Sequence, residues 1–383
     1  MVRYILFSIL FFSINSFAEM GFYTDLPENS AVHSKKSAVY KAYFPFPPLY
    51  TLSKEQLLKV DLNAINPKES DFIGKRAEYV QSLLFKRQIE DCIMNIDEKC
   101  FLFGSFVRGS LFFAQDNKTI FTAFHNVEGI INGQLQILKT LEGVDVFEPI
   151  GQKLAIESHF TKNVKEVDPF KVPELIELYK ELRTKKAPIV IENSEGEIIF
   201  GLNPSDNYES MDFKPELLYS TFGINMLKSY RDFTRIKISQ PLGNPLTIAT
   251  EEVYKEPRYL LGYPQKQDRS HLNKPSSDGE SFYFSKGKAL NVFDAEKRAG
   301  KDFNTSKEEN ERILKQLSYC DCDGTGGFSG GAAVNGRGEV SFITAEALLL
   351  DQNKANKDNV LLYGPRMTFV LEVLDKQDQL LFE

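Results

Sequence analysis

The chain has 383 residues, of which 42% are hydrophobic and 26% are charged. This composition is typical of a globular protein of one large or two ordinary domains, and it excludes a disordered chain. The net charge of −7 offers no basic surface for phosphate groups, so we expect no nucleic-acid partner.

The first 18 residues have the pattern of a secretory signal peptide. A basic start at Arg3 precedes an apolar run from Tyr4 to Ile14, and Ser16-Phe17-Ala18 places small residues at the two positions that a signal peptidase reads. The apolar run is shorter than the roughly 20 residues that a membrane span needs. We therefore predict cleavage after Ala18 and a secreted or periplasmic protein with no membrane association.

Residues 19–95 form a predicted N-terminal extension that is partly helical. Its first part, up to residue 67, looks irregular, and the proline-rich stretch 43–48 forbids regular helix and favours an extended path. From Asp71 to Met94 the apolar residues recur at helical spacing. The extension could be a removed pro-segment, an interaction module or a clamp on the rest of the chain.

From residue 96 to 383 the hydrophobic period shifts towards two, which predicts a domain of short β-strands. We expect these strands at 101–113 (a pair broken by glycine), 118–124, 135–138, 189–192, 197–200, 233–238, 259–262, 281–284, 289–292, 332–334 and 338–344. Two predicted insertions, at about 160–215 and 265–319, interrupt them and carry helices near 173–183 and 306–317. Many short strands with turn residues between them indicate an all-β barrel or sandwich.

The four cysteines that follow the signal peptide suggest disulfides, because an exported chain meets oxidising conditions. Cys320 and Cys322 are too close in sequence to pair comfortably with each other. Two cross-links between the early pair and the late pair, or a local Cys92–Cys100 bridge with two free thiols, both remain open. The spacing matches no zinc pattern, so we expect no metal.

Ser329 stands in the run Gly327-Phe328-Ser329-Gly330-Gly331. A serine hydroxyl needs a base near neutral pKa to become a nucleophile, and the oxyanion that then forms needs two backbone N–H donors. A glycine two positions before the serine lets the chain turn so that two amides converge. We expect those of Gly327 and Ser329 to form this oxyanion hole.

His125 is the best candidate for the base, because it follows an apolar strand and is flanked by Ala and Asn. All four histidines precede Ser329, which excludes an α/β-hydrolase, where the histidine follows the serine. Asp232 heads a strand of alternating apolar residues, a better context than those of Asp206 and Asp212. A subtilisin-like order would need an acid before His125 and an α/β sheet. The predicted chemistry is acyl-enzyme hydrolysis, most simply of peptides, with His125 as base, Asp232 as its orienting partner and no metal or cofactor.

Three segments resemble motifs of the trypsin-like (chymotrypsin-fold) serine peptidases, closest to their bacterial, glutamyl-endopeptidase-like branch. They are Thr122-Ala123-Phe124-His125, Asp232-Phe233-Thr234-Arg235-Ile236 and Gly327-Phe328-Ser329-Gly330-Gly331; Leu261-Gly262-Tyr263-Pro264 and Ser285-Lys286-Gly287-Lys288 resemble strands of the bacterial members. The resemblance implies two packed antiparallel six-strand β-barrels with the triad between them. Phe328 replaces the family's Asp, so activation through a new N-terminal amine is not available.

The resemblance also suggests a substrate pocket near Ser329. Asp323 precedes the serine by six positions, where trypsin carries the acid that attracts Lys or Arg, although bacterial relatives without that preference often carry an acid there too. Ala345 and Glu346 would flank the same pocket, and an inward Glu346 would argue against acidic substrates. The alternative is a catalytically silent binding or scaffold protein on the same fold.

Overall fold

The computed structural model describes residues 19–22, 26–63, 65, 75–95, 99–142, 170, 172–203, 205–219, 230–264, 282–299, 316–324, 328–349 and 360–382. The predicted signal peptide and nearly all of the helix predicted near 306–317 lie outside the described residues.

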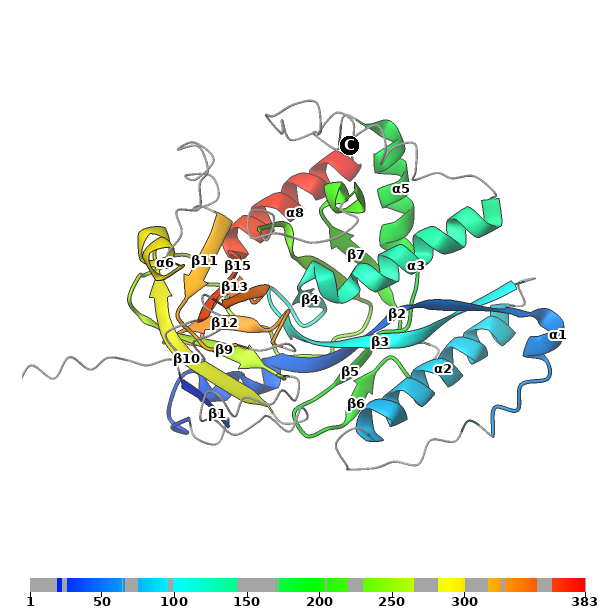
Figure 1. Cartoon of the computed structure of the whole chain (residues 1–383), viewed down its shortest axis with the longest axis horizontal. Coiled ribbons are helices and arrows are strands. Elements are labelled where there is room, and N and C mark those ends of the chain that lie inside the picture. Colours follow the sequence, from blue (N-terminus) through cyan, green and yellow to red (C-terminus); the bar gives the residue numbers. More distant parts are fainter. Residues whose placement is uncertain are drawn as a thin grey trace, which may run out of the picture.

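The first half of the chain builds a seven-stranded antiparallel sheet (Figure 1). Its order is β6 (Ile198–Phe200), β5 (Val190–Glu192), β2 (Val39–Ser53), β3 (Lys99–Phe113), β4 (Thr119–Thr122), β8 (Thr234–Ile238) and β7 (Tyr208–Phe213). Strands β5, β6 and β7 come from the segment 160–215, predicted as an insertion, and β2 comes from the predicted extension. The boundary predicted at 95/96 therefore falls between two strands, β2 and β3, that pair with each other.

The second half builds an eight-stranded antiparallel sheet. Its order is β13 (Val340–Ile343), β12 (Ala332–Asn335), β9 (Pro257–Gly262), β10 (Tyr283–Leu290), β11 (Leu317–Cys320), β15 (Val360–Pro365) and β14 (Glu346–Leu349), while β1 (Glu19–Phe22) pairs with β10 off this path. A bridge between Phe342 and Arg366 joins β13 to the end of β15, which brings distant members of the order together.

Strands β2 and β3 form a long two-stranded ribbon that extends beyond the other strands of the first sheet (Figure 1). The register shifts between Phe46 and Leu49, where two prolines stand, because proline has no N–H to donate to a ladder. The extended path predicted for this proline-rich stretch is confirmed. The irregular structure predicted for it is wrong, since the stretch belongs to a 15-residue strand.

Two helices cover opposite faces of this ribbon (Figure 1). Side chains alternate along a strand, so Ala42 and Phe44 pack with helix α3 (Phe124–Glu142), whereas Tyr43 packs with helix α2 (Lys75–Asn95). Helix α2 confirms the helix predicted at 71–94. The other helices of the described residues are α1 (Lys54–Leu57), α5 (Pro173–Thr184), α6 (Val292–Ala299) and α8 (Met367–Phe382), with 3-10 turns η2 (His33–Ala38) and η4 (Pro215–Tyr219).

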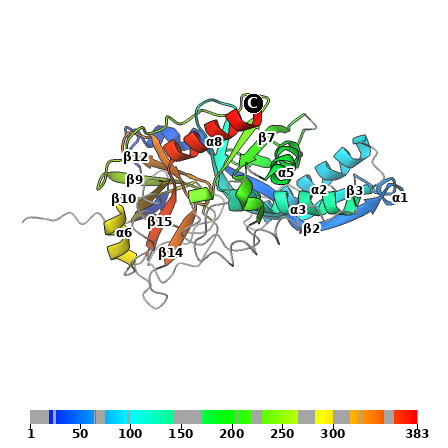
Figure 2. The ribbon, with the colours of Figure 1, turned by 90° about the horizontal axis from the view of Figure 1, so that it is seen from above.

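Helix α8 follows the last strand of the second sheet and runs across to the first, as the view from above shows (Figure 2). Its first turns bury Met367, Val370 and Leu374 in a core shared with both sheets. Its last turns reach the first sheet, where Gln377 donates to the carbonyl of Phe213 at 3.0 Å. The helix therefore ties the two sheets together.

The predicted fold class is confirmed: the chain is mostly β, with two antiparallel sheets consistent with a two-barrel trypsin-like architecture. Several details differ, and one is that the strands predicted at 281–284 and 289–292 form the single strand β10. The sheets hold seven and eight strands rather than six each, and residues 101–113 form one continuous strand rather than a pair. The strand predicted at 135–138 belongs to α3, because Val127, Ile130, Ile131, Leu135 and Leu138 follow the helical period and are all buried.

The cysteines form two local disulfides, Cys92–Cys100 and Cys320–Cys322. The expectation that Cys320 and Cys322 would not pair is wrong. Two residues apart in an extended strand span about 6.6 Å, but strand β11 ends at Cys320 and the chain bends, which brings the two Cα atoms to 5.1 Å. That separation lies within the normal range for a disulfide.

Among the helices of the described ranges, none combines the length and the apolar character that a membrane crossing requires.

Candidate active site

His125 and Asp232 form the centre of the candidate site. The ring Nδ1 of His125 lies 2.7 Å from Asp232 Oδ2, and the backbone N–H of His125 donates to Asp232 Oδ1 at 3.0 Å. Asp232 is buried, whereas 34% of the His125 side chain is exposed. The carboxylate of Asp232 thus contacts His125 at two points, while part of the ring stays exposed to solvent.

The strand register explains why residues 107 positions apart meet. Strands β4 and β8 are antiparallel neighbours, with Thr122 opposite Thr234. Asp232 precedes Thr234 by two positions, so it lies beside the point where the chain leaves β4 and enters helix α3. That point is where His125 stands.

The contact also sets the tautomer of the imidazole. An ionised carboxylate only accepts hydrogen bonds, so the proton on the neutral ring belongs on Nδ1. Nε2 then carries a lone pair and can accept a proton. This is the protonation state that a general base needs.

Ser329 is held beside this pair through its backbone carbonyl. The carbonyl accepts one hydrogen bond from the side chain of Asn126 and one from the backbone N–H of Ser110, both at 2.9 Å. Asn126 directly follows His125 in the first sheet's helix α3, and Ser110 belongs to β3 of the same sheet. The serine from the second half of the chain is therefore fastened to the residue next to the histidine.

A buried polar network supports this attachment. Asn126 also donates to Thr122 Oγ1 at 3.0 Å, and Thr122 donates to the carbonyl of Ser110 at 2.9 Å. The hydroxyl of Ser110 accepts the backbone N–H of Tyr263 at 3.0 Å, which adds a contact to the end of β9. Three buried polar side chains thus join both sheets around Ser329.

Gly330 could not be another residue without disturbing this network. Its φ of +81° lies in the left-handed region, and an added Cβ would stand 2.1 Å from Thr122 Oγ1 and 2.2 Å from the carbonyl oxygen of Ser110. Its N–H donates to the carbonyl of Thr344 at 2.7 Å. The glycine lets the backbone beside Ser329 press directly against the first sheet.

Of the other predicted site residues, the structure describes some and not others. Gly327 lies outside the described residues, so the predicted oxyanion hole stays a prediction. Asp323 and Ala345 are buried, and Ala345 follows Thr344, whose carbonyl binds Gly330. Glu346 begins strand β14. Strands β11 and β14 flank β15, with Cys320 and Ala347 both opposite Leu362, so the segments leading to Asp323 and from Glu346 share one neighbourhood.

The alternative acids have other partners. Asp212 binds the guanidinium groups of Arg183 and Arg235 at 2.6–3.0 Å. Asp206 accepts the backbone N–H groups of Gly201 and Asn203, both at 3.0 Å. Neither contacts a histidine in these interactions, whereas Asp232 does.

Sequence reasoning missed two polar groups at this site. The sequence shows Asn126 only as a polar neighbour of His125, and its burial, which indicates a role, appears only in the structure. Glu128 lies one helical turn after His125 and is half-buried. Burial chiefly raises the pKa of the Glu128 carboxyl; the charge of Asp232 raises it further, while His125 and a hydrogen bond from Asn132 lower it.

Within the ranges that the structure describes, no group of three or more His, Cys, Asp or Glu side chains is arranged to hold a metal ion. His125, Asp232 and Ser329 carry an imidazole, a carboxylate and a hydroxyl, which are groups capable of proton transfer and nucleophilic attack.

No protein-family model and no curated protein matches the chain. Solved structures similar to it include the Rv3671c protease of M. tuberculosis in its active form, with 11% identity over 91% of this chain and 84% of that one, at a TM-score of 0.38. The inactive form matches at 10% identity over 70% and 84% of the two chains, with a TM-score of 0.33. A serine endoprotease of Yersinia pestis matches at 12% identity over 94% and 68%, with a TM-score of 0.36. These are weak similarities, so the chemistry of the site has to be inferred from its own atoms.

Proposed function

We propose that this protein is an exported serine endopeptidase that hydrolyses peptide bonds through an acyl-enzyme intermediate. The observation that carries the proposal is the two-point contact between Asp232 and His125, whose neighbour Asn126 holds the backbone of Ser329. A bare histidine–aspartate pair is common in proteins; one fastened to a serine in a Gly-x-Ser-Gly-Gly run is typical of acyl transfer.

In the proposed reaction, Ser329 Oγ attacks the carbonyl carbon of the scissile bond while His125 Nε2 takes the hydroxyl proton. Asp232 stabilises the imidazolium that results. When the C–N bond breaks, the imidazolium gives its proton to the departing amine and the acyl group stays on Ser329. Water then attacks the ester while His125 again accepts a proton, and the imidazolium returns that proton to Ser329 Oγ as the ester C–O bond breaks and the carboxylic acid leaves. Backbone amides of Gly327 and Ser329 are the proposed donors to the oxyanion.

The substrate preference is part of the proposal. Asp323, Ala345 and Glu346 are the residues we propose near the substrate side chain. An Asp323 that faces the substrate predicts cleavage after Lys or Arg, whereas an Asp323 with a purely structural role predicts no such preference. A cleavage-site profile on denatured proteome peptides distinguishes the two.

The direct test is covalent labelling. We expect a fluorophosphonate probe to label Ser329 in the folded wild-type protein, and Ser329→Ala to lose both labelling and hydrolysis of a casein substrate. Folded protein that neither labels nor cleaves would favour the silent scaffold instead. N-terminal sequencing of the exported protein tests cleavage after Ala18 and any later removal of residues 19–95.

A further inference from the structure

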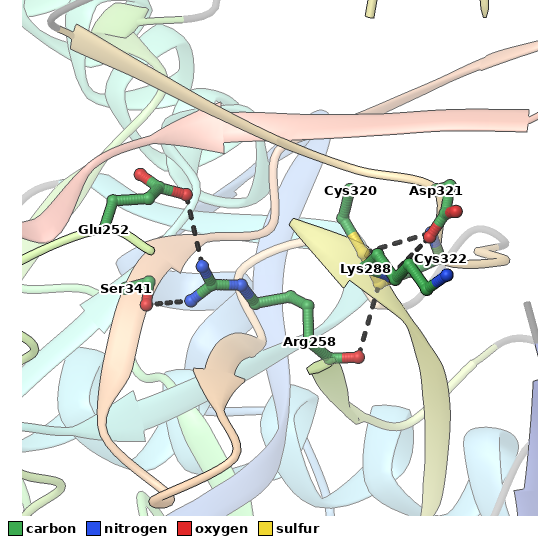
Figure 3. Close-up of a disulfide and its surroundings, with 7 residues drawn as sticks. All are labelled: Glu252, Arg258, Lys288, Cys320, Asp321, Cys322 and Ser341. Carbon is green, nitrogen blue, oxygen red and sulfur yellow. Dashed lines mark hydrogen bonds and ion pairs between the residues drawn. A yellow bond between two sulfur atoms is a disulfide. The ribbon is translucent and has the colours of Figure 1, made fainter. Parts of the chain in front are cut away.

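The Cys320–Cys322 disulfide lies at the end of β11, at the start of the segment that leads to Ser329 (Figure 3). Both cysteines are fully buried. The bend that joins them is closed by the backbone N–H of Cys322, which lies 3.0 Å from Cys320 Sγ. The disulfide therefore fixes the direction in which the chain leaves the sheet.

Neighbouring strands hold this bend on several sides. Cys320 lies opposite Ala289 of β10 and Leu362 of β15. Asp321 donates its N–H to the carbonyl of Lys288 at 3.2 Å, and its carboxylate accepts the N–H of the same residue, as Figure 3 shows. Cys320 and Asp321 are thus anchored to the neighbouring strands of the sheet.

The cysteines belong to the same buried cluster as the first described residue of the nucleophile segment, residues 328–331. Cys320, Cys322 and Phe328 belong to one buried cluster, and Phe328 directly precedes Ser329 in the sequence. The carbonyl of Phe328 accepts the N–H of Gly331 at 2.8 Å. The disulfide therefore packs in the same buried cluster as Phe328, which belongs to the backbone turn around Ser329.

The sequence separation argues that this disulfide does little for global stability. In the chain-entropy account, a disulfide stabilises by restricting the unfolded chain, and the effect grows with loop length. Cys320 and Cys322 are two positions apart, whereas Cys92 and Cys100 are eight apart. A cross-link that restricts so little of the unfolded chain acts mainly on local geometry.

We propose that the Cys320–Cys322 disulfide positions the nucleophile segment, so that full reactivity of Ser329 requires the oxidised pair. This inference rests on the proposed function of Ser329. Opening the pair needs an external dithiol: its thiolate attacks one sulfur, its second thiol resolves the mixed disulfide, and the products are two cysteine thiols and the oxidised reagent. Hydrogen bonds alone then hold the bend, and the positions of Phe328 and Ser329 are no longer fixed by the disulfide.

The test compares two paired variants. We expect Cys320→Ala/Cys322→Ala to lower kcat and the fluorophosphonate labelling rate by about tenfold or more, with KM changed less than about twofold, because alignment rather than binding is lost. The matched control, Cys92→Ala/Cys100→Ala, should keep its labelling rate within about twofold while its Tm falls further. Equal labelling rates for both paired variants would overturn the proposal.

A second readout does not depend on activity. Hydrogen exchange at the amides of Gly330 and Gly331, which bind Thr344 and Phe328, should be at least about tenfold faster without the Cys320–Cys322 disulfide and unchanged without the other one. Unchanged exchange would refute the positioning role even if activity fell. If wild-type protein does not label at all, the proposed function fails, and exchange alone decides this inference.

If the first paired variant does not fold, graded dithiothreitol treatment of wild-type protein replaces it. Mass spectrometry of alkylated thiols identifies which disulfide has opened. We expect labelling to fall with opening of Cys320–Cys322 and to return on reoxidation; labelling that follows only Cys92–Cys100 contradicts the proposal.

Discussion

The two halves of the candidate site are held in different ways. His125 and Asp232 stand just beyond the paired ends of adjacent strands of one sheet, β4 and β8, and contact each other directly through their side chains. Ser329 comes from the other half of the chain, and the contacts that hold it to the first sheet run through its backbone carbonyl and through Gly330. The base and its carboxylate can be aligned by one sheet alone, whereas the nucleophile depends on how the two sheets meet.

The largest effect should come from His125 and Asp232, which contact each other through their side chains and form the side-chain half of the site. Asp232→Asn keeps the shape but replaces an obligate acceptor, so the imidazole can adopt the wrong tautomer, and we expect kcat to fall by about 10⁴-fold. Asp206→Asn is the matched control, because Asp206 binds only loop residues in the described contacts, and it should stay within about threefold of wild type. Steady-state kinetics with a peptide substrate measures both, and a larger loss in Asp206→Asn would show that the wrong acid has been assigned.

Gly330→Ala probes the backbone half of the site, which is Ser329 and Gly330 with their contacts to the first sheet. The new Cβ would meet Thr122 and Ser110 at 2.1–2.2 Å, and the φ of +81° is unfavourable for alanine. We expect labelling of Ser329 to fall at least about 100-fold, since a misplacement of about 1 Å has that cost. Gly336→Ala is the control, because its Cβ would have no neighbour within 4 Å. Normal labelling in Gly330→Ala would contradict the close packing of the two halves.

Asn126 joins the halves, so Asn126→Ala should give an intermediate loss. Removing its side chain breaks the bonds to Ser329 and Thr122, and it leaves a cavity in a buried network. We expect kcat/KM to fall about 10- to 100-fold with a measurable drop in Tm. Asn244→Ala removes an exposed contact to Ser37 and should change neither kcat/KM nor Tm. An unchanged kcat/KM in Asn126→Ala would show that the hydrogen bond from Asn126 to Ser329 is dispensable.

The mostly β fold with two antiparallel sheets and the pairing of Asp232 with His125 could both be predicted from the sequence, because both depend on local patterns: short alternating strands, and an acid at the head of one of them. It could not show that β2 belongs to the first sheet, since pairing between Val39–Ser53 and Lys99–Phe113 bridges a segment of about 45 residues. Nor could it show that Asn126 reaches Ser329, 203 positions away. The Cys320–Cys322 disulfide could not be predicted, because the short separation in sequence argues against pairing and the bend after β11 appears only in the structure.

Helix α8 offers a smaller test of how the carboxylate half is supported. Arg235 stands three residues after Asp232 and binds Asp378 of α8 at 2.8 and 2.9 Å as well as the buried Asp212. Asp378→Asn should lower the free energy of unfolding by about 1–3 kcal/mol, because the buried guanidinium loses a charged partner. Glu372→Gln, which breaks an exposed pair with Lys376 on the same helix, should cost about 0–0.5 kcal/mol. Urea unfolding measures both, and equal values would mean that α8 is held by its apolar face alone.

The smallest effect concerns Glu128, which tunes the side-chain half without touching the backbone half. Burial chiefly raises the pKa of its carboxyl above the usual 4.5, so the folded protein binds more protons than the unfolded chain over the window just above 4.5. The free energy of unfolding therefore falls as the pH rises through that window. Above it the ionised Glu128 favours the His125 imidazolium. Glu128→Gln should remove both effects: the acid limb of kcat/KM moves to lower pH, by less than about one unit, and Tm at pH 7 does not fall. Glu372→Gln makes the same charge change on an exposed surface and should leave the limb in place. A limb that moves to higher pH, or equally in both variants, would mean that Glu128 does not act on the imidazole.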